Sequence, residues 1–112
     1  MEPRPSSSDL PPTFRAFTAR HPALAKAHRD VAQAVEEAGP LDGRIRALVK
    51  MGLCQGAGLE TAFRRHVGHA LDRGASSEEI EQAVLLGMNA VGFPRTVAAW
   101  KWAREEITAR AR

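Results

Sequence analysis

The chain has 112 residues, of which 44% are hydrophobic and 26% are charged, a balance that suits one compact globular domain. There are 16 Lys and Arg residues against 13 Asp and Glu, and this small, interspersed net charge of +3 indicates no nucleic-acid partner. The single cysteine, Cys54, excludes an intrachain disulfide, a redox pair of thiols and a zinc site made of several cysteines.

Two features bear on membranes and location. The longest nearly apolar run, residues 83–93, is shorter than the roughly 20 residues that cross a bilayer, so we expect no membrane partner. The first 12 residues carry Pro and Ser and lack the apolar segment of a secretion signal. We therefore expect a flexible tail over residues 1–12, a single helical domain over residues 13–112 and a cytoplasmic location.

Apolar spacing and stop signals predict the helices of the first half. After a first ordered segment near residues 13–17, a clear helix is expected over residues 21–38, and Gly39 and Pro40 end it. The apolar stripe of that helix, which we expect to be packed, comprises Leu24, Ala27, His28, Val31 and Val35. A further helix begins after Asp42, whose carboxylate can cap free backbone amides, and ends in the glycine-rich stretch 52–58.

Three helices are predicted in the second half. One spans residues 59–73, carries His66 in its apolar stripe and ends at a left-handed Gly74. Ser76 and Glu79 form the capping box of the next, over residues 77–91. Residues 92–94 are expected as a turn before the last helix. The inward side of the last helix is predicted to comprise Val97, Trp100, Ala103 and Ile107, which leaves Trp102 off the stripe.

No segment alternates like a strand, and the connections are short. Short connections between helices favour antiparallel neighbours. The sequence therefore predicts an all-α fold, a small antiparallel helical bundle.

Four stretches of the sequence, in their order and spacing, resemble the carboxymuconolactone decarboxylase and alkylhydroperoxidase D-like family. They are LDGRIRALVKMG at residues 41–52, RHVGHALDRGASSEEIEQAV at 65–84, LLGMNAVGFP at 85–94 and VAAWKW at 97–102. The resemblance covers about two-thirds of the chain, residues 41–107. It implies a helical fold of this family's type and a homo-oligomer, a trimer or a hexamer.

The peroxidase branch of the family is implied to need two thiols three residues apart, with a His and a Glu that relay protons. Aligned on His66, this pattern places the thiols at Leu59 and Ala62 and the Glu at Ala47, so all three groups are missing. An intrachain dithiol peroxidase cycle is therefore excluded. We interpret Cys54 as a small buried hydrophobe, with a one-cysteine alkylhydroperoxidase or peroxiredoxin-like activity as an alternative.

The decarboxylase branch, which lacks the thiol pair, is implied to use a histidine in a subunit-interface pocket on a small carboxylated lactone. His66 matches that histidine and is the candidate catalytic residue, a proton donor or acceptor near neutral pH. Arg46 is the candidate for binding a substrate carboxylate through its planar guanidinium. His69, three residues after His66, and Phe93, at the implied pocket edge, are further candidate substrate-binding residues.

Each candidate also has a structural alternative: a core imidazole for His66, a solvated charge for Arg46 and core burial for Phe93. We expect no cofactor, and no metal, because no third ligand stands at a suitable spacing beside His66 and His69. The leading hypothesis is a decarboxylase-like homo-oligomer that takes a small carboxylated or lactone-like metabolite. The alternative is a non-catalytic oligomeric module that binds a ligand or a protein, so enzyme status stays open.

Overall fold

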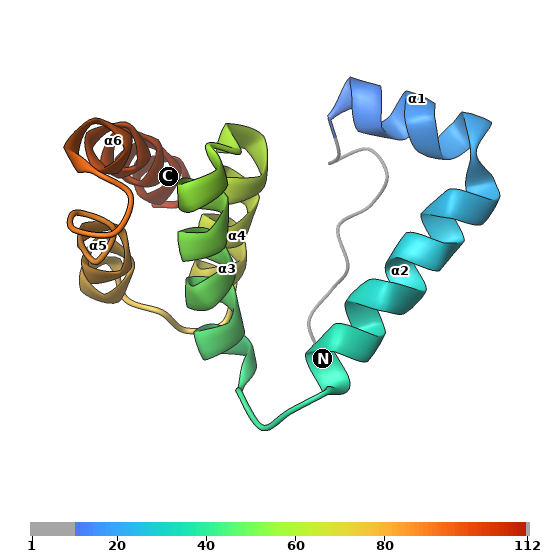
Figure 1. The fold of residues 1–112 in the computed structure, drawn as a ribbon, viewed down its shortest axis with the longest axis horizontal. Coiled ribbons are helices and arrows are strands. Elements are labelled where there is room, and N and C mark those ends of the chain that lie inside the picture. Colours follow the sequence, from blue (N-terminus) through green and yellow to red (C-terminus); the bar gives the residue numbers. More distant parts are fainter. Residues whose placement is uncertain (1–10, 112) are drawn as a thin grey trace. The chain divides into compact units, whose positions relative to one another are not determined.

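The computed structural model describes residues 11–111, and every regular element in that range is an α-helix. The helices are α1 (Pro12–Arg20), α2 (Pro22–Glu37), α3 (Gly43–Ala57), α4 (Glu60–Asp72), α5 (Ser77–Leu85) and α6 (Phe93–Arg110) (Figure 1). The predicted all-α fold is confirmed. None of the described helices is long and apolar enough to cross a membrane.

Contacts within the chain divide it into two compact units, an N-terminal unit that ends at Pro40 and a C-terminal unit that begins at Leu41. The expectation of one domain over residues 13–112 stays a prediction. The tail expected over residues 1–12 lies outside the described residues except for Pro11 and Pro12, and Pro12 already begins α1.

The described part of the N-terminal unit consists of α1 and α2. Each begins with a proline, whose fixed φ suits the first helical turn. The only buried residue of α2 is Ala25, whereas Leu24, Val31 and Val35 are 57%, 60% and 58% exposed. The expectation of a packed stripe on α2 is therefore wrong for the chain by itself. The neighbouring α1 has no buried residue and does not cover the stripe.

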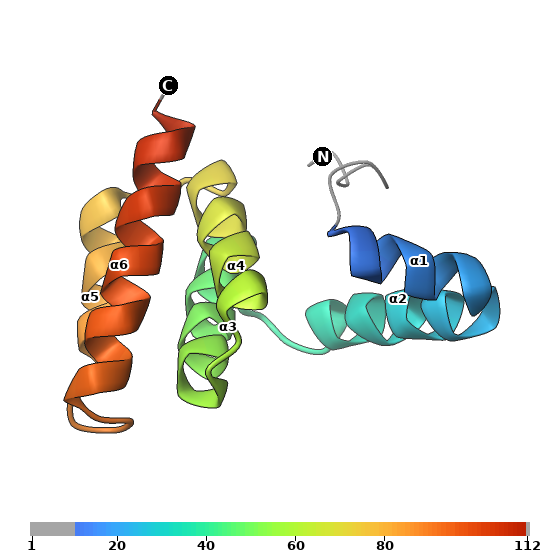
Figure 2. The ribbon, with the colours of Figure 1, turned by 90° about the horizontal axis from the view of Figure 1, so that it is seen from above.

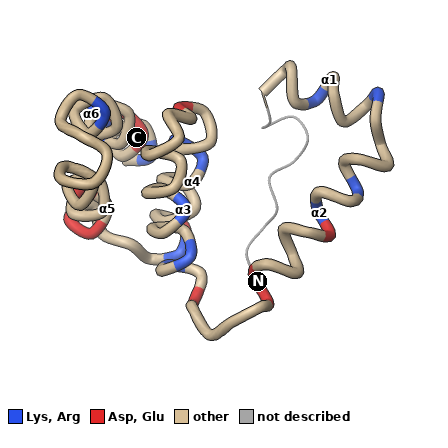
Figure 3. Tube along the Cα trace, in the orientation of Figure 1, with Lys and Arg blue, Asp and Glu red and all other residues tan. Residues whose placement is uncertain are grey.

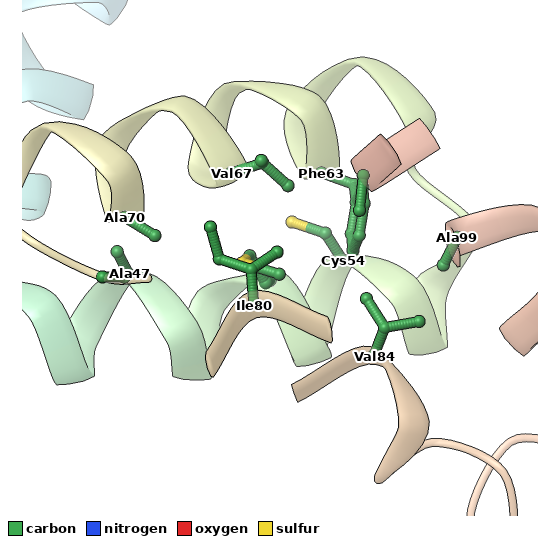
Figure 4. Packing of buried hydrophobic residues seen from close by; sticks show 11 residues of the cluster. Ala47, Cys54, Phe63, Val67, Ala70, Ile80, Val84 and Ala99 are labelled. Atoms are coloured by element: carbon green, nitrogen blue, oxygen red, sulfur yellow. The ribbon is translucent and has the colours of Figure 1, made fainter. Parts of the chain in front are cut away.

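The C-terminal unit is built from two helix pairs, α3 with α4 and α5 with α6, which pack against each other (Figures 1 and 2). Between α3 and α4 the chain reverses at Gly58, whose φ of 72° is the left-handed conformation that favours glycine. All four helices contribute to one apolar core (Figure 4). Its buried members are Ala47, Met51, Cys54, Phe63, Val67, Ala70, Ala75, Ile80, Val84, Ala99 and Ala103.

Local end signals of these helices are confirmed. The Asp42 carboxylate accepts a hydrogen bond of 2.9 Å from the Ile45 amide at the start of α3. Ser76 and Glu79 form the predicted capping box of α5, in which each side chain accepts from the other residue's amide. Gly74, after α4, has the predicted positive φ, 93°.

The predicted end of α5 is wrong, because the helix stops at Leu85 and residues 86–91 form turns. The amides of Gly87 and Met88 donate to carbonyls three residues back, which tightens the chain beyond an α-helix. The buried Gln55 of α3 donates from Nε2 to the Val84 carbonyl at 3.1 Å. A side chain distant in the sequence thus satisfies a carbonyl at the helix end, which periodicity could not reveal.

The start of α6 differs from expectation, and its inward face agrees with expectation in part. Phe93 and Pro94 are the first residues of α6 rather than a turn. The face that packs inward carries the small buried residues Thr96, Ala99 and Ala103. Trp102 packs edge-on against Phe63 with ring centroids 5.7 Å apart, whereas Trp100 is 43% exposed. Of the predicted stripe, Ala103 is buried and Ile107 packs against the core, whereas Val97 and Trp100 are 47% and 43% exposed. Small residues at the contact let α6 approach the core closely.

Candidate functional site

His66 lies in the middle of α4, beside the line along which α4 packs on α3. Phe63, Val67 and Ala70 of α4 are fully buried along that line. His66 comes directly before Val67 and is only partly buried. Its Nδ1 atom is buried and meets no hydrogen-bond partner within residues 11–111. Such an atom is costly to leave unsatisfied, which marks His66 as the polar side chain of α4 that needs an explanation.

His69 is the nearest aromatic neighbour of His66. The two rings meet edge-on, with centroids 5.5 Å apart and an interplanar angle of 77°. This proximity follows from their spacing of three residues on one helix. Within the described range, no group of three His, Cys, Asp or Glu side chains could hold a metal ion.

The surroundings of His66 disfavour its protonation. Burial is the largest cause, and the positive charges of His69, Lys50, Arg65 and Arg73 add to it, so that the pKa of His66 falls from 6.5 to about 4. The imidazole is therefore neutral at pH 7 in the chain by itself. The exchange of protons near neutral pH that the sequence suggested requires a bound group that favours the charged form.

The charged residues around His66 come from both helices of the α3–α4 pair. Lys50 directly precedes the buried Met51 of α3, just as His66 directly precedes the buried Val67 of α4. On a helix, each residue is rotated by about 100° from the residue that follows it. Because α3 and α4 are antiparallel, this rotation turns Lys50 and His66 away from their contact to the same side of the helix pair. We use the name basic flank for His66 together with the groups whose positive charge acts on it, Lys50, Arg65, His69 and Arg73. Figure 3 shows Lys and Arg residues in blue along α3 and α4.

Two arginines near the start of α3 bind backbone carbonyls. Arg73 lies across Gly43 and donates from Nη1 to its carbonyl at 3.4 Å, which confirms that the end of α4 meets the start of α3. Arg46 donates from Nη1 to the Leu41 carbonyl, and its Nε is buried without a partner within the described residues. The guanidinium of Arg46 is thus turned toward the chain before α3. Its role in carboxylate binding stays a prediction.

Phe93 lies away from the two histidines. It is 63% exposed at the first position of α6, so the alternative of core burial is wrong. Two residues later, Arg95 donates from Nη1 to the Gly56 carbonyl at 2.8 Å, which places this end of α6 at the last turn of α3. Gly56 is six residues beyond Lys50, about 9 Å along the helix axis. The structure therefore brings His66, His69 and Lys50 together and does not add Phe93 to them.

The positions aligned with the peroxidase pattern hold no reactive groups. Ala47 is fully buried between α3 and α4, and Leu59 is 53% exposed. Cys54 is 9% exposed within the apolar core, and burial raises the pKa of its thiol more than nearby Lys50 lowers it. Glu60 pairs with Arg64 at 3.0 Å. The interpretation of Cys54 as a buried hydrophobe is consistent with this burial.

A separate groove of about 480 Å³ runs between α3 and α5. Its walls are mainly apolar, with Val49, Leu86 and Val91 exposed to solvent at 49%, 68% and 39%. Arg44 and Glu79 form an ion pair at its edge. His66 is not among its lining residues. The groove is thus a second uncovered surface of the C-terminal unit, apart from the basic flank.

Sequence reasoning missed Lys50, Arg65 and Arg73 of the basic flank, and of these only Lys50 comes from the other helix of the pair. The signal that could have found it is the repeated pair of a polar residue before a buried apolar one, Lys50 with Met51 and His66 with Val67.

Comparison with known proteins relates the chain to one family. The model of the carboxymuconolactone decarboxylase family matches residues 22–105, from the first residue of α2 to within α6. No curated protein and no solved structure matches the chain. The family match spans more than half of the sequence, including α2, which precedes the stretches quoted above. The chain therefore belongs to the carboxymuconolactone decarboxylase family.

Proposed function

We propose that the chain is a decarboxylase-like protein in which His66 assists proton transfer on a small carboxylated or lactone-like metabolite. The observation that carries this proposal is the partly buried imidazole of His66, whose Nδ1 has no partner within the described residues and which lies among cations. An anionic substrate suits this environment, because it would offset the positive charges and favour the protonated imidazole. His69, beside it, is positioned to contact the same substrate.

Decarboxylation of such a substrate requires a cation that binds its carboxylate and a group that donates one proton. When a carboxylated lactone loses CO₂, the bond to the carboxylate carbon breaks and its electron pair moves toward the lactone carbonyl. One proton must then be added to carbon to give the neutral product. An imidazolium at His66, regenerated from solvent, would supply that proton. No metal or cofactor takes part in this proposal.

We further propose that the protein acts as a homo-oligomer, a trimer or a hexamer, with its pocket at a subunit interface. Support comes from the large apolar side chains that the C-terminal unit leaves exposed. They include Val49, Leu53, Leu86, Phe93 and Trp100, at 49%, 67%, 68%, 63% and 43%. A chain this small gains stability when such surface is buried against a copy.

The direct test is CO₂ release from carboxymuconolactone by the purified full-length chain. We expect turnover, and we expect His66→Ala to lower it by about 100-fold or more, as is usual for loss of a proton-transfer group. His28→Ala, on α2, is the matched control and should retain the wild-type rate. Light scattering checks that the oligomeric mass is the same in all three proteins. A wild-type rate in His66→Ala would contradict the catalytic role.

The second candidate function is a non-catalytic binding module. It is favoured by Ala47, which is fully buried at the position where the family resemblance places a proton-relaying Glu. Under this alternative the lactone binds but releases no CO₂ above background.

The one-cysteine peroxidase is tested separately, by hydrogen-peroxide consumption with a thiol donor. We expect background rates that Cys54→Ser leaves unchanged, because the thiol is buried and its pKa is raised. Robust consumption that is lost in Cys54→Ser would instead support the peroxidase.

A further inference from the structure

We propose that the apolar groove between α3 and α5 binds helix α2 of a second copy of this chain. The inserted surface is the α2 ridge, a name we give to the exposed side chains of Leu24, Val31 and Val35. The inference rests on the proposed homo-oligomer and deepens it by naming two surfaces that meet. It gives a partner to two apolar surfaces that the chain by itself leaves open.

Helix α2 belongs to the part of the chain that the family shares. The family match begins at Pro22, the first residue of α2, and leaves out α1. Contacts within the chain nevertheless assign α2 to the N-terminal unit, and the side chains of the α2 ridge are 57–60% exposed. Most of the stability of an amphipathic helix comes from packing of its apolar side, so we expect the α2 ridge to have a partner.

The groove matches the α2 ridge in length. On α3, its lining residues run from Arg44 to Gln55, eleven residue steps or about 16 Å along the helix axis. The α2 ridge runs from Leu24 to Val35, which is also eleven residue steps. A helix lying along the groove could therefore place the whole ridge against it.

The groove also suits an apolar helix in its chemistry. Leu86 and Val91 expose apolar surface along it. Gly52 lines the same groove, and a Cβ atom at this position would meet nothing within 4 Å. A position without a side chain lets the backbone of a docking helix approach closely. The charged groups at the edge, Arg44 and Glu79, pair with each other, so an apolar occupant leaves this ion pair intact.

The buried area is sufficient for a stable association when every copy both donates and receives a ridge. The sixteen residues of α2 make a helix about 24 Å long, and the half of its surface that faces a groove measures about 400 Å². A copy that donates its ridge and receives another buries about 800 Å², the area that each partner buries in a typical stable interface. This condition is met around a two-fold axis or in a closed ring.

The connection between α2 and α3 favours a second copy over the chain's own groove. It consists of residues 38–42. Pro40 disfavours a helical conformation at Gly39, and Asp42 has extended backbone angles, with φ −72° and ψ 170°. A short connection with extended residues resists the tight reversal that would return α2 to its own chain. Elements on short, strained connections are those that copies of a protein exchange.

The first experiment fills the groove of the full-length protein. Gly52→Leu adds a side chain where α3 has open space and replaces a glycine inside a helix, so the single chain should stay folded. We expect the protein concentration at which the assembly dissociates, measured by light scattering, to rise at least about tenfold, because an overfilled contact must repack. An unchanged concentration, with circular dichroism showing a folded chain, would overturn the inference.

The matched control is Ala57→Leu, which adds the same side chain to the exposed last residue of α3, outside the groove. It should change the dissociation concentration less than about twofold, as is usual for a surface substitution. An equal rise in Gly52→Leu and Ala57→Leu would show that added apolar bulk on α3 has this effect anywhere, and would also count against the groove.

The second experiment joins the two surfaces directly. A tagged chain with Val31→Cys is mixed with an untagged chain with Val49→Cys, and a short bis-maleimide is added after the copies have exchanged. Val31 and Val49 lie near the middle of the ridge and of the groove lining, so they meet whichever way α2 runs. We expect linked pairs of one tagged and one untagged chain. Cys54 should contribute little, because its thiol is buried and its pKa is raised.

Two controls define the meaning of the cross-link. Lys101→Cys, exposed on α6, replaces Val49→Cys in a parallel mixture and should give far less linked product. A chain that carries both Val31→Cys and Val49→Cys should link to other copies. If this double variant instead closes within single chains, α2 occupies its own groove and the inference is wrong.

The exchange of α2 and the proposed function fail separately. If the assembly is unaffected by Gly52→Leu and its copies do not link, the homo-oligomer stands and the exchange falls. If copies link through Val31→Cys and Val49→Cys while carboxymuconolactone releases no CO₂, the exchange stands and the activity falls. A monomer at every concentration would remove both the oligomer and the exchange, and CO₂ release would then decide the activity by itself.

Discussion

Helices α2 and α4 have similar amphipathic patterns but different surroundings. In α4, Phe63, Val67 and Ala70 are completely buried against α3, α5 and α6. In α2, the equivalent stripe of Leu24, Val31 and Val35 is more than half exposed. The comparison shows that an apolar stripe predicts that a helix needs a partner, while only the rest of the fold decides whether one is supplied.

The largest expected contrast is between aromatic truncations in the two units. Phe63→Ala removes a fully buried ring that also packs on Trp102, and it should lower the free energy of unfolding by about 3–5 kcal/mol. Phe17→Ala removes a ring that is 51% exposed on α1 and should cost less than about 1 kcal/mol. Urea unfolding followed by circular dichroism measures both, and equal losses would contradict the contrast.

The next effect concerns acid sensitivity on α4. Between pH 6.5 and about 4 the unfolded chain binds a proton at His66 that the folded chain does not, so the stability due to this group is present above pH 6.5 and lost as pH falls toward 4. His66→Gln should remove about 1–2 kcal/mol of that loss, a value reduced for the partial exposure of the ring. Unfolding at pH 7 and pH 4 in both proteins tests it; an identical pH dependence would refute it.

A smaller effect is expected at the start of α5. Ser76→Ala deletes the side chain that accepts from the Glu79 amide and should cost about 1 kcal/mol. Ser76→Asp, which can accept the same bond, is the control and should keep most of the stability. No difference between the two variants in thermal unfolding would show that the cap is replaced by solvent.

The smallest effect is expected on α2. Val31→Ser lies on the exposed stripe and should change the free energy of unfolding by less than about 0.5 kcal/mol at low protein concentration. A loss above about 2 kcal/mol, growing with protein concentration, would show that the stripe is buried in the assembled protein. Light scattering of the same samples gives the oligomeric mass at each protein concentration, to which the loss of stability can then be compared.

Helix positions and ends could be predicted well where the signal is local. Asp42, Ser76 with Glu79, and Gly74 behave as their residue types predict, because each acts on amides or on its own backbone within a few residues. The end of α5 was predicted wrongly, and there the Val84 carbonyl accepts from the Gly87 amide and from Gln55, on another helix, which no local pattern reveals. The partial burial of Trp102, while Trp100 stays exposed, likewise depends on how closely α6 approaches Phe63.

The candidate site could be predicted only within one helix. The pairing of His66 with His69 follows from their spacing on α4. Lys50 was missed because its proximity to His66 depends on the register between two helices, which no local pattern fixes. The hydrogen bond from Arg46 to the Leu41 carbonyl could not be predicted from the sequence either. Site residues that come from two different helices can be identified only once the packing of those helices is known.

The contact between Gln55 and Gly87 has an evolutionary consequence. A Cβ atom at Gly87 would overlap the Gln55 amide nitrogen, the same atom that donates to the Val84 carbonyl. A side chain at position 87 therefore requires the Gln55 amide to move away from its bond to Val84, or position 55 to become smaller. Homologues that carry alanine at the first position should carry a shorter residue at the second, so the two sites are expected to covary.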